Sequence, residues 1–447
     1  MIALCSMFGS ALANSKAPAS PGAARYAFVA GQELTYRTTW SFKYWKGDKS
    51  STQDQRTDVT IWVLRANRDG SYRLVVRQRD AVIWIRSGVK QENAPSTEIL
   101  YADVFPDGRE LPHGSSEFRV IPAILFPPLP RDAAQGKAGW EAQGQDMGFV
   151  CKRADGASGL VFDAAVQTPF DALLLDSHQA RYTFDAGRGL IASSVDTWAR
   201  DSSIKGAGNG KTQLLAAKAM KPDALKEMLG DADPYFTAIE RYDARAQAAS
   251  RAAPDTAERL LRDAAAHLKS ATAGLRQPDM KAAAEARLKE HEARASYVIR
   301  ELAERARRIG KAAPLFETTD IDGNKVRLAD LRGKVVVLDF WYRGCGPCAR
   351  SMPQMNQLAA DFAGRPVAIL GMNIDRDPAD ARFVAQKMQL KYPTLKAQDL
   401  TGKYGVEGFP TLIIIDQQGA IRDIHLGYNP TLRQDVGKAV GALLERK

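Results

Sequence analysis

Residues 335–348 read Val335-Val336-Val337-Leu338-Asp339-Phe340-Trp341-Tyr342-Arg343-Gly344-Cys345-Gly346-Pro347-Cys348. The first four are apolar and mostly β-branched, which predicts a strand of a parallel sheet that is covered on both faces. Pro347 suits the first turn of a helix, where its missing N–H would have no partner anyway. The stretch therefore predicts a buried strand, a short loop and a helix that starts at the two cysteines and is kinked at Pro353.

The two cysteines are expected where this helix begins. Unpaired backbone N–H groups and the positive end of the helix dipole stabilise a thiolate there relative to a thiol. Two cysteines at this spacing can also close a small disulfide, the second attacking the bond that the first has formed. The alternatives are half of a zinc site or a purely structural disulfide. Zinc needs about four ligands, but the other cysteines are Cys5 and Cys151 and none of the five histidines is near in sequence. The pair favours redox chemistry without a metal.

Length and composition limit the classes of protein that fit. The chain has 447 residues, too many for one ordinary core, and about two to four domains are expected. It is 45% hydrophobic and 26% charged, as folded proteins are. The net charge is +10, but basic residues are scattered among 52 acidic ones, so no nucleic-acid partner is predicted. No apolar run reaches the roughly 18–20 residues of a membrane span, so no transmembrane anchor is predicted.

Residues 1–24 are predicted to be a signal peptide followed by a linker. A short apolar run ends in Ala-Leu-Ala, typical of a secretory cleavage site, after Ala13 or Ala17. No basic residue precedes the run, which a misassigned start codon would explain; a disordered tail is the alternative. Cys5 follows a leucine, which argues against a lipoprotein anchor. The rest, rich in Ala, Ser, Pro and Gly, is a linker. We expect a periplasmic or secreted protein.

Residues 25–218 are predicted to form a β-rich domain. Alternating segments are separated by turn signals such as Asp69-Gly70, which predicts an antiparallel sheet, curled or sandwiched. The expected strands are 34–40, 58–64, 72–77, 81–85, 180–184 and 190–195. This region shows no nucleophile–base pair, metal-ligand spacing or phosphate loop. Its Trp and Tyr side chains either line a concave ligand surface or form the half-buried face of an ordinary sheet. We expect Cys151 to be a small buried hydrophobic residue.

Residues 219–310 change sharply to Ala, Arg, Glu and Leu, which predicts a helical spacer between two domains. Asp255 or Thr256 is the expected cap of the helix that opens at Pro254. The four expected helices are 222–229 (ended by Gly230), 234–252, 254 to about 275, and 278–308 (ended at Gly310).

Residues 311–447 alternate between strand and helix patterns. This predicts a mixed sheet with helices on both faces. The expected elements are a hairpin within 313–334, a strand whose apolar run is 335–338, strands 367–375, 408–416 and 421–426, a helix that starts at the two cysteines and continues through Met352 to a kink at Pro353, and helices 378–390 and 430–445.

This last region resembles the thioredoxin fold, specifically the extracytoplasmic TlpA/ResA-like thiol–disulfide oxidoreductases. The resemblance rests on linked motifs, namely the hairpin with Asp322-Gly323, Phe340-Trp341 before Cys345-Gly346-Pro347-Cys348, Pro353, and Phe409-Pro410-Thr411. Two positions depart from the pattern. Gly371 stands where thioredoxin has a lysine, and the glutamate that some TlpA-like proteins carry has no clean counterpart, although Asp375 and Asp377 are near.

The resemblance implies roles for individual residues. Cys345 would be the attacking thiolate and Cys348 the resolving thiol. Asp339 would lie buried beneath the helix and take the proton of Cys348 as a general base, although it could also serve only local backbone donors. Pro410 would be cis and lie against the disulfide.

The resemblance also implies a surface for the client protein. Phe409, before the cis-proline, would offer backbone hydrogen bonds to a substrate strand, and Trp341 would shield the cysteines from water. The expected client-binding residues are Trp341, Gly346, Pro347, Phe409 and Thr411.

These observations favour a thiol–disulfide oxidoreductase that reduces disulfides of client proteins through a mixed disulfide. Its cofactor would be its own redox-active disulfide, and its electrons would come from a membrane or soluble thiol donor. The dipeptide Gly346-Pro347 is the thioredoxin one and favours reduction. One alternative is a binding protein whose β-rich domain carries the main role. Another is a thiol peroxidase, but peroxiredoxins place Thr or Ser where this chain has Tyr342.

Overall fold

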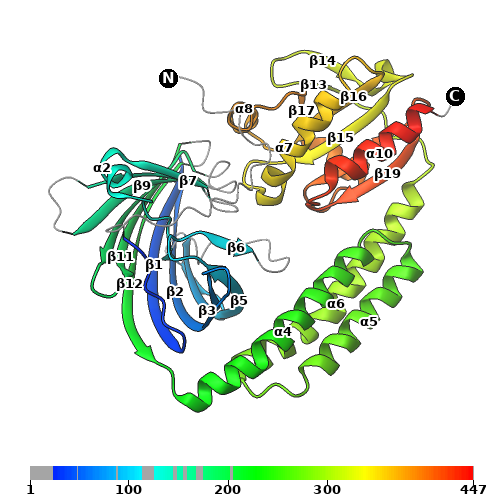
Figure 1. The fold of residues 1–447 in the computed structure, drawn as a ribbon. Helices are drawn as coiled ribbons and strands as arrows, with labels where there is room; N and C mark the ends of the chain where they lie inside the picture. Colours follow the sequence, from blue (N-terminus) through cyan, green and yellow to red (C-terminus); the bar gives the residue numbers. More distant parts are fainter. Residues whose placement is uncertain are drawn as a thin grey trace.

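The computed structural model describes residues 24–445 except 48, 87–88, 113–124, 144–147, 155–158, 168–174 and 202–204. It contains a large β sheet, a helical middle region and a C-terminal α/β domain (Figure 1). The predicted multidomain fold class is confirmed. The predicted signal peptide lies outside the described residues. Among the helices that are described, none is long and apolar enough to cross a membrane.

The N-terminal region forms one antiparallel sheet of 12 strands. The predicted strands 72–77 and 81–85 are a single strand, β3, because the polar residues between them are paired inside the sheet rather than in a turn. Thr57 and Gln78 both donate to the carboxylate of Asp80. In order across the sheet the strands are β6 (Glu110–Pro112), β5 (Ser96–Val104), β3 (Tyr72–Arg86), β2 (Lys49–Ala66), β1 (Gln32–Lys46), β12 (Lys205–Ala219), β11 (Leu190–Arg200), β10 (Ser177–Asp185), β9 (Leu160–Gln167), β8 (Gly148–Arg153) and β7 (Trp140–Gln143), with β4 (Val89–Glu92) on β3 and a short helix α2 (Ala133–Ala138) before β7.

The sheet is curled, one of the two predicted shapes. Val104 of β5 and Phe149 of β8, from opposite ends of the strand order, belong to the same hydrophobic core. Tyr36 and Tyr182 are fully buried in that core. These two tyrosines therefore stabilise the fold and do not line an open ligand surface. Cys151 is buried there too, as expected.

The helical region contains three long helices, α4 (Pro222–Ala249), α5 (Pro254–Thr272) and α6 (Pro278–Arg308). The predicted break at Gly230 and Pro234 is wrong, because α4 runs through both. An interior proline disfavours a helix by roughly 3 kcal/mol. Here the next residues, Tyr235 and Phe236, are buried against the outer face of the sheet, and Phe236 stacks on Tyr101 at 4.2 Å. Burial of two large aromatic side chains outweighs that penalty.

The residues at the ends of α5 and α6 agree with the sequence prediction for one helix and not for the other. The predicted cap of α5 at Asp255 or Thr256 is wrong: the N-cap is Ala253, without a side-chain hydrogen bond, and Pro254 begins the helix. The predicted bounds of α6 are confirmed, with Gln277 accepting a hydrogen bond from the N–H of Met280 at its start.

The C-terminal domain has a mixed sheet, as predicted, and its five strands include one, 394–396, that was not expected. Its order is β17 (Thr394–Lys396), β16 (Val367–Asn373), β15 (Val335–Trp341), β18 (Thr411–Ile415) and β19 (Ile421–Leu426), with β15, β16 and β17 parallel and β18 antiparallel to β15. The other elements are the hairpin β13 (Glu317–Thr319) and β14 (Lys325–Arg327), two single 3₁₀ turns (Leu328–Leu331 and Gln398–Leu400), and helices α7 (Gly346–Asp361), α8 (Pro378–Lys387), α9 (Thr401–Tyr404) and α10 (Leu432–Glu445).

The end of α6 is attached directly to the C-terminal domain. Arg308 donates to the carbonyl oxygens of Tyr404 and Gly405 at 3.0 and 2.8 Å. The N–H of Gly310 donates to the carbonyl of Ile421 at 2.8 Å. Because these bonds reach backbone atoms on two elements, they set the direction in which the domain leaves the helix.

Candidate redox-active site

The central strand β15 carries the chain to the two cysteines. All seven of its residues are buried, and it pairs with β16 on one side and β18 on the other. The strand ends at Trp341, so the following loop emerges at the carboxyl end of the parallel strands. Loops at this edge of an α/β sheet are held by a rigid scaffold, and functional residues are commonly placed there.

Cys345 and Cys348 form a disulfide at the start of α7, with their Cα atoms 5.2 Å apart. Cys345 is the N-cap residue, and its sulfur accepts a hydrogen bond from the N–H of Cys348 at 3.2 Å. Pro347 lies in the first turn and Pro353 within the helix, as predicted. After reduction, the same N–H and the helix dipole would stabilise a thiolate on Cys345.

A tight apolar shell surrounds the disulfide. Trp341 is fully buried and belongs to one cluster with both cysteines and Met352. Phe409 packs against this cluster and meets Tyr342 edge-on at 5.2 Å. Such a shell excludes water from the disulfide, which is the role predicted for Trp341.

The Phe409–Pro410 peptide bond is cis, as predicted. The register of β15 and β18 pairs Phe340 with Thr411, so Pro410 comes level with the end of β15 beside the cysteine loop. The Pro410 carbonyl accepts a hydrogen bond from the N–H of Gly427 at 2.8 Å.

The five predicted client-binding residues differ in access. The Trp341 and Thr411 side chains are buried, and Gly346 is buried as well. Pro347 and Phe409 are half-buried. A client that approached this structure would therefore meet Pro347 and Phe409 first.

Asp339 is buried beneath this site with 2% of its surface exposed. Burial raises the pKa of its carboxyl group to about 7, and a hydrogen bond from the hydroxyl of Tyr392 to Oδ2, at 3.1 Å, partly opposes that rise. The other oxygen, Oδ1, has no hydrogen-bond partner within the part of the chain that is described. A carboxyl with a pKa near neutrality and one unoccupied oxygen can both accept and return a proton.

Gly371 explains one departure from the thioredoxin pattern. It pairs with Asp339 across β15 and β16. A Cβ atom at Gly371 would lie 3.0 Å from Nε1 of Trp341 and 3.2 Å from a ring carbon of Tyr392. A lysine side chain there would press on both of these rings. The polar group beside Asp339 is Tyr392 instead, a residue that the sequence analysis missed because no local motif marks it.

The loop before Cys345 is anchored by Arg343, also missed. Its backbone N–H donates to Oδ2 of Asp375 at 2.7 Å, and its guanidinium contacts Oδ1 of Asp380 at 3.1 Å. The guanidinium lies over the ring of Phe383 at 3.8 Å. Asp375 thus serves the cysteine loop, whereas Asp377 caps α8. The sequence does mark Arg343 in one way, because it is a charged residue that stands two positions before Cys345, close after a buried strand.

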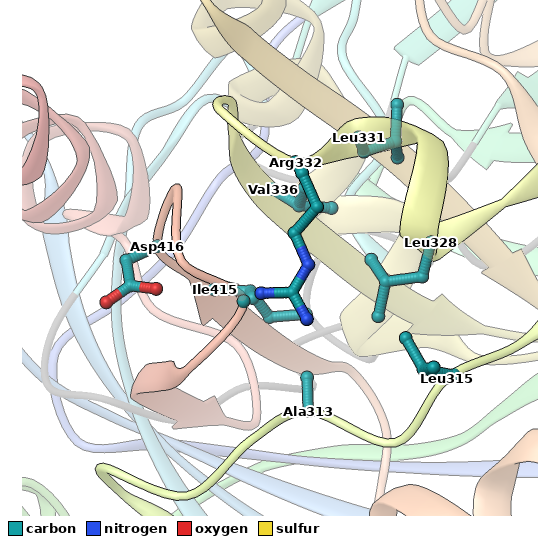
Figure 2. A pocket seen from close by; sticks show the side chains of 9 residues that line it. Ala313, Leu315, Leu328, Leu331, Arg332, Val336, Ile415 and Asp416 are labelled. Atoms are coloured by element: carbon teal, nitrogen blue, oxygen red, sulfur yellow. The ribbon is translucent and has the colours of Figure 1, made fainter.

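Figure 2 shows a pocket at the other end of the sheet. Arg332 extends across it, and Val336 lies at the start of β15, far along the strand from the cysteines. The pocket is therefore separate from the redox site. The residues that line this pocket are Ala313, Leu315, Leu328, Leu331, Arg332, Val336, Ile415, Asp416 and Gly419.

Within the described residues, no group of His, Cys, Asp or Glu is arranged to hold a metal ion.

Comparison with known proteins agrees with this geometry. The model of the AhpC/TSA family matches residues 309–424. Thiol-disulfide oxidoreductase ResA from Bacillus thuringiensis (strain Al Hakam) is 37% identical over 121 residues, which are 27% of this chain and 70% of ResA. Thioredoxin-like protein YneN from Bacillus subtilis (strain 168) is 34% identical over 122 residues, 26% of this chain and 71% of YneN.

A solved structure, described as a putative thiol:disulfide interchange protein DsbE from Chlorobium tepidum, is 31% identical. It covers 30% of this chain and 97% of its own, with a TM-score of 0.29. On the sequence relatives, the chain belongs to the ResA family of thioredoxin-like thiol–disulfide oxidoreductases through its C-terminal domain. The resemblance expected from the motifs is confirmed, and the chain is a thiol–disulfide oxidoreductase.

Proposed function

We propose that this protein reduces disulfide bonds in client proteins. The thiolate of Cys345 attacks one sulfur of a client disulfide, which breaks that bond, forms a mixed disulfide and releases one client thiolate. Cys348 then attacks the sulfur of Cys345, releases the second client thiolate and restores the Cys345–Cys348 disulfide. Two electrons pass from the enzyme to the client.

Asp339 supports a redox cycle at this disulfide, in either direction. Cys348 must lose its proton before or during its attack, and a carboxylate beneath the helix, with a pKa of about 7, can take that proton near neutral pH. The burial of Asp339, with the raised pKa that follows from it, is the single observation that carries the proposal. A disulfide that served only structure would not need a buried titrating group.

The direction of electron flow rests on the dipeptide between the cysteines. The dipeptide between the cysteines, Gly346-Pro347, is the thioredoxin one. To act repeatedly as a reductase, the protein must be re-reduced by a dithiol donor, membrane-bound or soluble, which attacks the Cys345–Cys348 disulfide in turn. We place this cycle outside the cytoplasm because of the signal-peptide pattern in residues 1–24.

Trapping with a Cys348→Ser variant tests the proposal. Without the resolving thiol, Cys345 should remain covalently bound to clients, seen as high-mass bands on non-reducing gels that collapse on reduction. The Cys345→Ser/Cys348→Ser double variant is the matched control and should trap nothing. Absence of any complex with the single variant would contradict the attacking role of Cys345.

The reduction potential of the cysteine pair, measured against glutathione, decides the direction. A strongly reducing potential agrees with a client reductase, and one well on the oxidising side would make the protein a disulfide-forming enzyme.

Turnover of hydrogen peroxide tests the peroxidase alternative. We expect none above the background of free thiols, since Tyr342 packs on Phe409 at the position where peroxiredoxins place Thr or Ser.

A further inference from the structure

The redox domain and the β sheet meet beside the cysteines. Asp176, immediately before β10, lies 3.7 Å from the guanidinium of Arg343. Asp176 is fixed to the sheet because its N–H donates to the carbonyl of Ala199 on β11 at 2.9 Å. The contact therefore joins the rim formed by β10 and β11 to the residue two positions before Cys345. In Figure 1, α7 and α8 lie on the side of the redox domain that faces this sheet.

Charged side chains from both domains meet at this contact, and those of Arg343 and Asp380 are buried. The Arg343 side chain is only 2% exposed and, among the described residues, touches Asp380 from its own domain and Asp176 from the sheet. Arg200, the last residue of β11, adds a fourth charge. Burial lowers its pKa, and so does the charge of Arg343. Within the described residues, the positive groups Arg343 and Arg200 and the carboxylates Asp176 and Asp380 thus meet where the domains touch. Removing one carboxylate would leave buried positive charge less well compensated.

Access to Cys345 is restricted by the apolar shell of its own domain, and the loop that carries Cys345 is tied to the sheet through Arg343. Its residue surface is 3% exposed. Thiol–disulfide exchange requires the attacking sulfur to approach a client sulfur directly, so its rate depends on access as well as on thiolate content. A folded client cannot reach a sulfur that is buried to this degree. The loop that carries Cys345 must become more exposed first.

We propose that the rim of the β-rich domain acts as a cover for the redox site, held closed by the ion pair between Asp176 and Arg343. This inference rests on the proposed function and adds its regulation. In the closed state, Cys345 is withheld from protein disulfides. When Asp176 leaves Arg343, the cysteine loop becomes accessible. Asp380 stays with Arg343 in both states, because the two belong to one domain.

Alkylation of the reduced full-length protein tests the cover. Two reagents are compared, iodoacetamide and a bulky polyethylene-glycol maleimide. Loss of a partly buried ion pair should raise the population of the open state by about threefold to tenfold. Asp176→Asn should therefore accelerate alkylation of Cys345 by that factor, with the larger effect for the bulky reagent. Asp163→Asn removes an exposed pair with Arg181 on the same sheet and should change nothing.

A second measurement needs no variant. Added salt screens an ion pair that is partly exposed, as Asp176 is. High ionic strength should thus accelerate alkylation of the wild type by uncharged iodoacetamide and have less effect on Asp176→Asn. Equal rates in the wild type and Asp176→Asn, with no effect of salt, would overturn the cover. Client trapping by Cys348→Ser remains a separate test, so failure of the proposed function would leave the alkylation result interpretable.

Discussion

Asp339 and Tyr392 form the buried polar pair beneath the disulfide. In the related thioredoxin pattern a lysine serves this carboxyl, whereas here Gly371 takes its place and a tyrosine hydroxyl donates the hydrogen bond. A neutral donor stabilises the carboxylate less than a cation would. The pKa of Asp339 is accordingly raised to about 7, so the group changes its charge within the physiological range.

The Asp339→Asn substitution should make the redox domain more stable at alkaline pH. Because burial raises the folded-state pKa of Asp339 above its unfolded value, stability is greatest below the unfolded pKa, about 4, and falls as the pH rises to about 7. Asparagine removes this dependence. Urea unfolding should show a variant advantage that is small below about pH 4 and reaches the order of 4 kcal/mol at about pH 8.

The same variant tests the proton-accepting role. Without the carboxylate, resolution of the mixed disulfide at neutral pH should slow about tenfold or more, as for loss of a general base. Stopped-flow measurement of that step is the readout. An unchanged rate, together with the expected stability gain, would leave Asp339 with a structural role only.

Tyr392→Phe should shift the pH dependence of activity upward. The hydroxyl hydrogen bond lowers the pKa of Asp339, so its loss should raise that pKa and move the rising limb of the rate–pH profile to higher pH. Tyr404→Phe is the matched control, since its buried hydroxyl donates to the Pro314 carbonyl elsewhere in the domain. A profile displaced equally by both variants would show a general loss of packing instead.

Cys151 should be inert. It is 2% exposed, and burial raises the pKa of its thiol to about 12, so almost no thiolate forms at neutral pH. In protein that lacks residues 1–24, and with them Cys5, iodoacetamide should label two thiols in the reduced native state and three after unfolding. Cys151→Ala should preserve redox activity while lowering stability by about 1 kcal/mol. A large loss of activity would reveal a third redox participant.

The site was predictable to the extent that its residues are close in sequence. Cys345, Cys348 and Asp339 share one strand–loop–helix unit, so their motif identifies them. Tyr392 lies 53 positions from Asp339, and Asp176 belongs to another domain. Contacts of this kind arise from tertiary packing, which leaves no periodic pattern or fixed spacing to recognise.

Among the elements, helix α4 shows how local signals can mislead. Gly230 and Pro234 disfavour a helix interior, yet the helix continues because Tyr235 and Phe236 pack on the sheet. The bounds of α6 were predictable because Pro278 suits its first turn and the chain reverses at Gly310, whose φ is +82°. Gly and Pro residues thus predict the ends of a helix correctly where no tertiary contact favours a longer helix.

Asp231 of α4 should be the most sensitive polar residue in the helical region. Its Oδ2 accepts hydrogen bonds from the N–H groups of Arg276 and Gln277, both at 2.6 Å, and so fixes the entry into α6. Asp231→Ala would leave two backbone donors unpaired and should destabilise the region by about 2 kcal/mol. Thermal unfolding measures this, with the exposed Asp223→Ala of the same helix as the control. Equal losses in both variants would contradict the role.

At the scale of the molecule, the three regions are joined in two different ways. The sheet and helices share an apolar cluster in which Trp62 and Tyr101 pack on Met228 and Phe236. The redox domain instead meets its neighbours through polar contacts such as that of Arg308 with Gly405. Apolar burial couples unfolding more strongly than a few hydrogen bonds do.

Unfolding should therefore occur in two transitions. Reduction of the Cys345–Cys348 disulfide should destabilise only the redox domain, by about 2 kcal/mol on the chain-entropy relation for so short a loop. Calorimetry should show one transition lowered by a few degrees and another unchanged. A single transition that moves as a whole would show that the regions unfold together.

The pairing of β1 with β12 has a mechanical consequence. Gln32 lies opposite Ala219, and the N–H of Met220 donates to the carbonyl of Gly31 at 2.7 Å. The chain thus enters and leaves the sheet at the same end of this antiparallel ladder. A force that pulls these two points apart therefore breaks the hydrogen bonds between β1 and β12 one after another. It does not load all of them at once in shear. Single-molecule stretching across residues 31 and 220 should therefore open the sheet from its first pair, at low force.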